Sequence, residues 1–212
     1  MIRSRKIAGR GLGWSAGDLA TKPYARFWNP DMAPLGEAAR AALAQGPVAE
    51  DLLPPASAAQ SIFFGDAAPI ENGFALPDDG SLRVACLTPM PGVAPEMVDW
   101  WFGWHSDSPE RYKLWHPRAH VHAVWGATPR PGSEGRARYL GATSIVDEYI
   151  GSDFIRGAIS FAPPAEFGLR DARLDNSEMT IICARTAPAD LPLKAGALAH
   201  QVRRTAAGSE MR

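Results

Sequence analysis

Three histidines fall within fifteen residues of the sequence, in the stretch RYKLWHPRAHVHAVW at 111–125. His120 and His122 stand two residues apart where polar and apolar residues alternate, so on a strand both imidazoles project from one face. Two imidazoles on one face can bind one metal ion, and a catalytic zinc takes nitrogen and oxygen ligands together with a water. The alternative is a polar strand face on which each ring is satisfied by a backbone carbonyl. The spacing alone leaves both interpretations open.

Glu148 is a second candidate ligand, in the next predicted strand. One loop separates it from His120, so an antiparallel pair can bring the carboxylate opposite the imidazole. A histidine and a glutamate from adjacent strands would make half of a zinc site. The other interpretation is a solvated acidic pair, Asp147 and Glu148, at a strand end, and the residues taken alone favour it.

The remaining candidates carry less specific signals. His200 stands alone in a late predicted strand, an arrangement that is more often structural than catalytic. Tyr112 and Lys113 lie on a helix edge, where such side chains commonly bury their stems and expose their polar ends. Five of the seven tryptophans crowd into the same zone as the histidines: Trp100, Trp101, Trp104, Trp115 and Trp125. Aromatic walls bind flat apolar ligands, while a few polar groups fix their orientation.

Short helices and antiparallel strands must position these residues, so the predicted fold class is α+β. A helix is predicted at 34–46, where a proline comes early and a glycine follows the end. Two further helices begin at Pro95 and Pro109, the second with Ser108 as its N-cap, and Pro117 ends it.

Strands are predicted from alternating or apolar runs bounded by turn residues, at 82–87, 120–125, 138–151, 155–164, 177–185 and 198–203. The segment 128–137 is predicted to be a turn-rich loop. A turn at 207–208 starts a last hairpin, and we expect its outer strand to be left as an open edge.

The composition excludes several classes of protein. Among 212 residues, 22 Lys and Arg balance 23 Asp and Glu, so no basic excess indicates binding to nucleic acid or to a membrane surface. No apolar run approaches the roughly 18 residues that span a bilayer, and the basic start lacks the apolar core of a signal peptide. Cys86 and Cys183 lie far apart and predict no disulfide framework. We therefore expect a cytoplasmic globular protein.

The stretch MPGVAPEMVDWWFGWHSDSPERYKLWHPRAHVHAVW at 90–125 resembles the signature block of the 2,4-diacetylphloroglucinol hydrolase and phloretin hydrolase family. DGSLRVA before it and AHQVRRTAAGSEMR after it resemble the same family, over roughly residues 70–212 in total. The resemblance implies a zinc-dependent hydrolase that cleaves the carbon–carbon bond between an acyl group and a phenolic ring. It also implies a Bet v 1-like helix-grip fold, in which a curved antiparallel sheet wraps around a long C-terminal helix.

Carried over position by position, the resemblance makes His120 the first metal-binding histidine and Glu148 the glutamate from the sheet. Tyr112, eight positions before His120, becomes a substrate contact, and His200 becomes a histidine on the substrate side. Both are implied to act in catalysis by binding phenolic oxygens and moving protons. The other histidines of the signature have no implied role beyond support: His105, His116 and His122.

The family pattern also has an H-x-x-x-E motif on the final helix that supplies two more metal ligands, and these 212 residues contain none. We therefore expect a truncated chain, with an irregular and helical segment at 1–75 and an incomplete helix-grip catalytic domain at 76–212. The expected function is zinc-dependent hydrolysis of an acylphloroglucinol-type ketone, and the truncation leaves the activity of this chain open. The alternative is a non-catalytic protein that binds a phenolic or other aromatic small molecule. A homodimer is left open.

Overall fold

The computed structural model describes residues 11–65, 70–126, 129, 132–171, 174, 178–190 and 196–212. These residues form short helices and an antiparallel sheet, which confirms the predicted α+β class. The chain divides into two compact units. Unit 1 comprises Met1–Ala33, Trp100–Phe161 and Ala184–Gly196, and unit 2 comprises Pro34–Asp99, Ala162–Cys183 and Ala197–Arg212. The predicted boundary near residue 75 stays a prediction.

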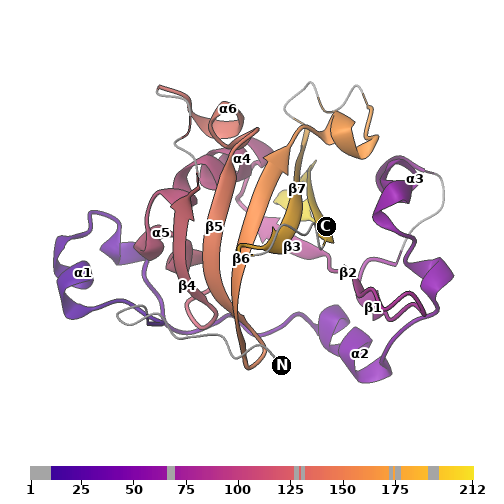
Figure 1. Cartoon of the computed structure of the whole chain (residues 1–212), viewed down its shortest axis with the longest axis horizontal. Helices are drawn as coiled ribbons and strands as arrows, with labels where there is room; N and C mark the ends of the chain where they lie inside the picture. The colour runs from indigo at the N-terminus through magenta and orange to yellow at the C-terminus, as the bar shows by residue number, and fades with distance from the viewer. Residues whose placement is uncertain are drawn as a thin grey trace. The chain divides into compact units, whose positions relative to one another are not determined.

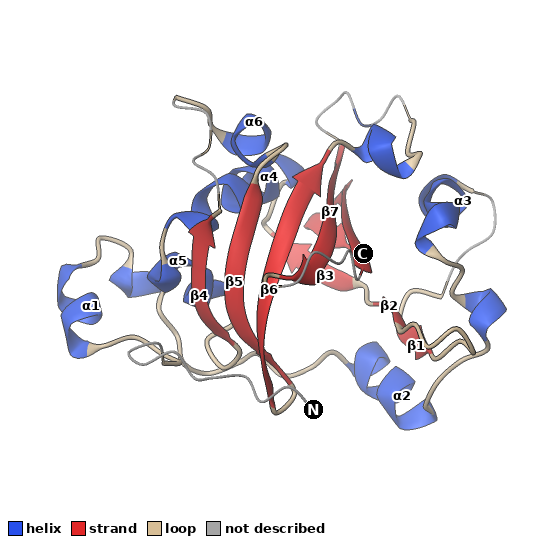
Figure 2. Ribbon diagram, viewed as in Figure 1, coloured by secondary structure: helices blue, strands red, loops and turns tan. Residues whose placement is uncertain are grey.

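The strands pair into two sheets (Figure 2). Their bounds are β1 Gly73–Ala75, β2 Arg83–Ala85, β3 Thr88–Pro91, β4 His120–Trp125, β5 Thr143–Ile150, β6 Asp153–Ala162, β7 Met179–Pro188, β8 Gly196–Thr205 and β9 Gly208–Met211. β1 pairs with β2, and the other strands follow the order β3-β9-β8-β7-β6-β5-β4. The predicted strands are therefore present, with ends shifted by a few residues.

Three of the helices begin where local signals place them. α5 (Pro109–Trp115) has Ser108 as its N-cap, and the Ser108 side chain accepts a hydrogen bond from the backbone N–H of Arg111. Proline suits this first position because its missing N–H would lack a helical partner anyway. α4 (Pro95–Trp104) also starts at its proline, as predicted. α1 (Ala16–Thr21) begins with a capping box formed by Ser15 and Asp18.

The core of unit 1 lies between α5 and the strands β4, β5 and β6. Tyr112 on α5 packs with Ala123 on β4 and Val146 on β5, and Ile159 on β6 lies against them. Figure 1 shows α5 running beside β4. Because α5 has one buried side, the side chains that it turns toward the sheet are fixed by packing rather than by the helix alone.

One predicted strand in unit 1 is partly wrong. The run predicted at 138–151 begins as a helix, α6 (Gly135–Tyr139), and becomes a strand only at Thr143. Tyr139 is fully buried and its ring contacts the rings of Phe102 and Phe161. These tertiary contacts decide the local structure. The loop predicted at 128–137 lies partly outside the described residues, and its last three residues belong to α6.

Unit 2 contains an aliphatic core under short helices. Helix α2 (Glu37–Gln45) confirms the prediction at 34–46, and Gly46 ends it at a φ of +85°. Helix α3 (Ala59–Phe64) contributes Ala59 to a buried cluster with Leu169, Ile181 and Cys183.

The open edge predicted for the last hairpin is wrong. β9 pairs with β8 on one side and with β3 on the other, where Thr88 lies opposite Met211 and Pro91 opposite Gly208. β3 contains two prolines and carries no strand signal of its own, so only this distant pairing reveals it. At Gly208 a side chain would come within 2.4 Å of the backbone nitrogen of Gly92, so the close approach of these backbones requires glycine.

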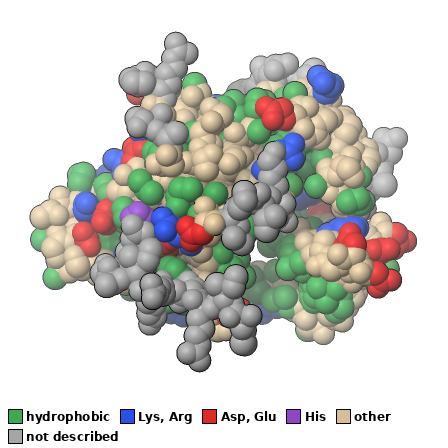
Figure 3. Space-filling view, in the orientation of Figure 1, with side chains coloured by type: hydrophobic (Ala, Val, Ile, Leu, Met, Phe, Trp, Pro, Cys, Tyr) green, Lys and Arg blue, Asp and Glu red, His purple; other side chains and the backbone are tan. Residues whose placement is uncertain are grey.

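The described surface matches the balanced composition. On the face drawn in Figure 3, basic and acidic side chains lie near one another instead of in separate fields. Among the described residues, no helix combines the length and the apolar character needed to cross a bilayer.

Candidate active site

Three of the residues singled out in the sequence meet in unit 1. The register of β4 and β5 places His120 directly opposite Glu148, which confirms the predicted cross-strand pairing. The Nε2 atom of His120 lies 3.8 Å from Oε2 of Glu148, and the two side chains are 15% and 23% exposed. Tyr112, from α5, completes the group. The predicted solvated acidic pair is therefore not what this strand end contains, because Asp147 is fully buried.

Tyr112 contacts both partners. Its hydroxyl donates a 2.5 Å hydrogen bond to Oε2 of Glu148, and its ring stacks on the ring of His120 with centroids 3.7 Å apart and planes 1° from parallel. The side chain is only 4% exposed, so the expectation of a surface group is wrong for Tyr112. Burial, followed by the charge of Glu148, raises the pKa of Tyr112 above its usual value of 10. The phenol therefore stays protonated and acts as a donor.

The tautomer of His120 follows from its second contact. Nδ1 lies 2.9 Å from the backbone carbonyl oxygen of Tyr112. A carbonyl can only accept, so Nδ1 carries the proton and the lone pair of Nε2 points toward Glu148. Burial lowers the pKa of His120 to about 4. At pH 7 the ring is neutral, so the 3.8 Å contact with Glu148 is not an ion pair at that pH.

The two histidines of the H-x-H pattern do not share a face. A bulge in β4 shifts the register between them, so that His120 lies opposite Glu148 while His122 lies opposite Asp147. Cross-strand partners share a face, and successive residues on β5 project to opposite faces. The interpretation of His120 and His122 as one metal pair, made from the spacing alone, is therefore wrong. The bulge instead directs His120 toward Tyr112.

Asp107 is a partly exposed anchor that sequence reasoning missed, with its side chain 27% exposed. Its carboxylate accepts hydrogen bonds from Arg111 at 2.7 Å, from Trp125 at 2.9 Å and from Arg138 at 2.7 Å. These donors lie on α5, at the end of β4 and on α6. Burial raises the pKa of Asp107, but the hydrogen bonds from Arg138 and Trp125 outweigh it and hold that pKa below its usual value. One carboxylate thus ties together the elements that carry the site.

Two further histidines surround the site. The ring of His105 stacks on Tyr112 at a centroid distance of 5.7 Å, and burial lowers the pKa of His105 to about 4. The ring of His116 lies 5.6 Å from that of His120, and its Nδ1 is buried without a hydrogen-bond partner among the described residues. The signature block contained both histidines, but nothing in their spacing assigned them these places.

The other candidates lie elsewhere or serve other contacts. His200 is on β8 in unit 2, where burial lowers its pKa to about 4, and its role toward a substrate stays a prediction. Lys113 donates a hydrogen bond to the carbonyl of Gly13 instead of lying free on the surface. The tryptophans mostly pack on one another and on their neighbours, and Trp100 is 50% exposed.

The pair of His120 and Glu148 fits part of a zinc site. Zinc–nitrogen and zinc–oxygen bonds together span at most about 4.3 Å, so one ion can bind Nε2 and Oε2 across 3.8 Å. The Nδ1–H bond to a carbonyl is also the outer contact that orients metal-binding histidines. A catalytic zinc usually has three protein ligands, and the described residues contain no group of three metal-binding side chains.

Comparison with known proteins gives a consistent answer. The family described as the DAPG hydrolase PhiG domain matches residues 53–212. A 2,4-diacetylphloroglucinol hydrolase of a Pseudomonas species is 33% identical over 170 residues, which cover 75% of this chain and 57% of the relative. The enzyme of that name from Pseudomonas protegens is also 33% identical, over 75% of this chain and 55% of the relative. Phloretin hydrolase of Eubacterium ramulus is 32% identical over 173 residues, with 76% and 61% covered.

The chain therefore matches little more than half the length of these curated relatives. The matched residues 53–212 include Tyr112, His120 and Glu148, so the geometry described above lies inside the shared region. The resemblance expected from the signature block is confirmed, and the chain belongs to the DAPG hydrolase PhiG domain family.

Proposed function

We propose that this chain forms part of a zinc-dependent hydrolase that cleaves the carbon–carbon bond between an acyl group and a phloroglucinol-type ring. The observation that carries the proposal is the pair of candidate ligand atoms, Nε2 of His120 and Oε2 of Glu148, held 3.8 Å apart. The names of the relatives, which include hydrolases of 2,4-diacetylphloroglucinol and of phloretin, support the substrate class.

His120 and Glu148 would hold the zinc ion. When bound, zinc would supply a Lewis acid that polarises a carbonyl and lowers the pKa of a coordinated water toward about 7. The neutral state of His120 suits this role, because only an unprotonated imidazole nitrogen can bind a metal. Further ligands are needed beyond these two residues.

In the proposed reaction, water adds to the acyl carbonyl carbon and the bond from that carbon to the ring breaks. The electron pair passes to the ring carbon, which takes up a proton, and the products are a carboxylic acid and the deacylated phenol. Tyr112, which stays protonated, has one hydroxyl proton and donates it to Glu148. On substrate binding it would turn that proton to a phenolic or carbonyl oxygen of the substrate. His200 is proposed to contact the substrate as well.

We also propose that the sheet is of the Bet v 1-like helix-grip type. The antiparallel order of seven strands with short helices between β3 and β4 supports this assignment. In such a fold the ligand-binding groups project from the sheet, as His120 and Glu148 do from β4 and β5.

The test combines metal binding with turnover. The purified chain is dialysed against zinc and then against buffer, bound zinc is measured, and loss of a monoacylphloroglucinol is followed. We expect zinc to bind and its binding to be lost in His120→Ala and Glu148→Gln, whereas His122→Ala retains it. Zinc binding that is equal in all variants would contradict the proposed ligands. Binding of the ketone without turnover, indifferent to a chelator, would instead identify a non-catalytic binding protein.

A further inference from the structure

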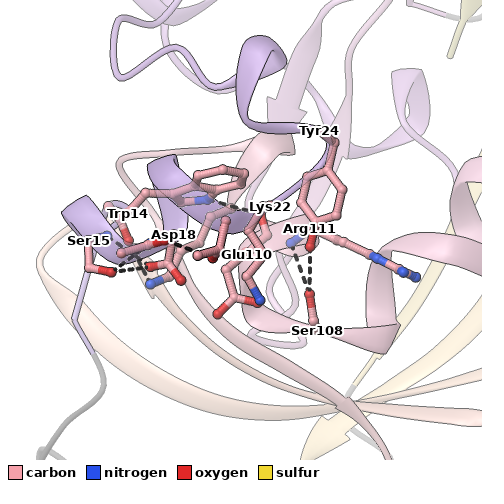
Figure 4. A network of polar contacts seen from close by, with 12 residues as sticks. Trp14, Ser15, Asp18, Lys22, Tyr24, Ser108, Glu110 and Arg111 are labelled. Carbon is pink, nitrogen blue, oxygen red and sulfur yellow. Dashed lines mark hydrogen bonds and ion pairs between the residues drawn. The ribbon is translucent and has the colours of Figure 1, made fainter.

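Residues 13–24 form a segment that grips helix α5 from outside the region shared with the family. The indole Nε1 of Trp14 donates to the backbone carbonyl of Glu110 at 3.1 Å, and Nζ of Lys22 binds Oε2 of Glu110 at 3.2 Å. From α5 itself, Nζ of Lys113 donates to the carbonyl of Gly13 at 2.7 Å. Figure 4 shows Trp14 and Lys22 converging on Glu110. We call residues 13–24 the N-terminal clamp.

The clamp is ordered by its own contacts. Ser15 and Asp18 form the capping box of α1, which orders the middle of the clamp. The ring of Trp14 meets that of Tyr24 edge-on at 5.6 Å, so the two ends of the clamp touch. The hydroxyl of Tyr24 lies 3.3 Å from Oγ of Ser108, the N-cap of α5. The clamp therefore holds α5 at its start and again one turn later.

Helix α5 depends on such outside support. It has seven residues, and isolated helices shorter than about 12 residues are marginal in water. Tertiary contacts must therefore set its position. On one side it packs on Ala123 and Val146 through Tyr112, and on the other it meets the clamp through Glu110 and Lys113.

Arg111 and Tyr112 lie between those two clamp contacts, and Tyr112 contributes twice to the site. Its hydroxyl binds Glu148, and its backbone carbonyl fixes the Nδ1 tautomer of His120. A shift of α5 would therefore move the donor to the substrate and release the orientation of a proposed metal ligand together. Catalytic groups misplaced by about 1 Å can lose about a hundredfold in rate.

We propose that the N-terminal clamp is a positioning element of the active site, with Trp14, Lys22 and Lys113 as positioning residues that act through α5 on Tyr112 and His120. The part of this proposal that concerns turnover rests on the proposed function. The part that concerns the His120 ring does not, because that ring is oriented by the chain's own carbonyl.

The test uses the full chain with the double substitution Trp14→Phe and Lys113→Met. Both changes keep apolar bulk and remove two of the contacts between the clamp and α5, those of Trp14 with Glu110 and of Lys113 with Gly13, while the contact of Lys22 with Glu110 remains. We expect kcat to fall about tenfold with KM changed less than about twofold, because orientation and not substrate affinity is lost. The matched control is Asp31→Asn, which removes a 3.7 Å contact with Arg118 elsewhere in the N-terminal segment and should leave kcat unchanged.

The second readout is the ring N–H of His120 in nitrogen-15 NMR of the metal-free chain. In the unsubstituted protein we expect an Nδ1–H signal that is protected from exchange with solvent. The double variant should lose this protection. The protection should recover when Lys113→Arg replaces Lys113→Met and restores a donor to Gly13. If the double variant does not fold, the two single variants replace it. A lower melting temperature with an unchanged His120 signal would give the clamp a purely structural role and overturn the proposal.

The two proposals fail in different ways. If no variant turns over the ketone, and the unsubstituted chain does not either, the proposed function fails while the NMR signal still decides the role of the clamp. If the unsubstituted chain is active and the double variant matches it in both kcat and ring signal, the clamp proposal alone fails.

Discussion

One buried cluster in each unit is built from a different kind of side chain. In unit 2 the central cluster is aliphatic and neutral, with Leu169, Ile181 and Cys183 each at most 1% exposed. In unit 1 the corresponding cluster surrounds Tyr112, whose hydroxyl reaches a partly buried carboxylate and whose ring covers an imidazole. One cluster removes apolar area from water, whereas the other also removes groups that water solvates well.

This difference separates stability from chemistry. Burial of apolar area stabilises a fold by roughly 25 cal/mol per Å², so the cluster of unit 2 contributes directly. Desolvating a carboxylate and a phenol costs free energy that one hydrogen bond only partly offsets. Groups held at such a cost are typical of functional sites, where perturbed pKa values gather. We therefore expect substitutions in the two clusters to have opposite signatures.

The largest effect on stability should come from the aliphatic cluster. Ile181→Ala removes a side chain that is 1% exposed and leaves a cavity, so the free energy of unfolding should fall by about 2–5 kcal/mol. Zinc affinity at neutral pH should stay the same. The measurement is urea unfolding, and Ile150→Ala, at a residue 61% exposed, is the control that should change little. A similar loss of unfolding free energy in both variants would contradict the stabilising role of the aliphatic cluster.

The next effect should appear in metal binding and not in folding. His120→Ala removes Nε2, one of the two proposed ligand atoms, and should weaken zinc binding by more than about a hundredfold, since even outer contacts are worth about 10–100-fold. The melting temperature of the metal-free chain should drop less than in Ile181→Ala. Isothermal titration with zinc measures the affinity, and a thermal scan measures the melting temperature. Unchanged zinc affinity would remove His120 from the site.

Tyr112→Phe should separate a loss of turnover from a loss of metal binding. It keeps the ring that stacks on His120 and removes only the donor to Glu148. We expect kcat for the acylphloroglucinol to fall about a hundredfold, in the range typical of lost proton donors, while zinc still binds. Steady-state kinetics with parallel metal analysis checks this. Loss of zinc together with activity would mean that the hydroxyl serves the metal site rather than the substrate.

The smallest effect should depend on pH and should be common to both units. Burial lowers the pKa of His105 in unit 1, and of His200 in unit 2, to about 4 from an ordinary value of 6.5. Below pH 6.5 the unfolded chain binds protons that the folded chain does not bind until about pH 4. Stability is therefore complete above pH 6.5 and is lost as pH falls toward 4.

For His105, which is 5% exposed, this amounts to about 1 kcal/mol between pH 7 and pH 5.5. Urea midpoints at the two pH values measure the loss, and His105→Gln should reduce it. A midpoint that does not change with pH in the unsubstituted chain would show that these rings are not held neutral by burial.

Much of the site could be predicted because its signals are local or lie one loop apart. Pro109 and Ser108 locate the helix that carries Tyr112, and a single connection brings Glu148 opposite His120. The bulge that turns His122 away could not be predicted, because it appears only when the register of β4 against β5 is known. The carbonyl that fixes the tautomer of His120 belongs to the backbone and has no sequence signal at all.

The rest of the fold escaped prediction where distant contacts override local preference. Residues 135–139 form a helix because Tyr139 is buried among aromatic rings. β3 is a strand only because β9 pairs with it. Likewise the contacts of Trp14 and Lys22 with Glu110 join residues that are 96 and 88 positions apart. No sequence signal in the first thirty residues predicts these contacts.

The pairing of β3 with β9 has a consequence for how the protein is made. Residues 88–91 leave the ribosome well before residues 208–211, which are about 120 positions later. At a synthesis rate of about 5–20 residues per second, β3 waits at least about 6 seconds for its partner strand. Pairings of such long sequence separation also form slowly once both strands exist. During that interval β3 waits without its partner, and its two prolines, which have no N–H to donate, limit its pairing with another nascent chain.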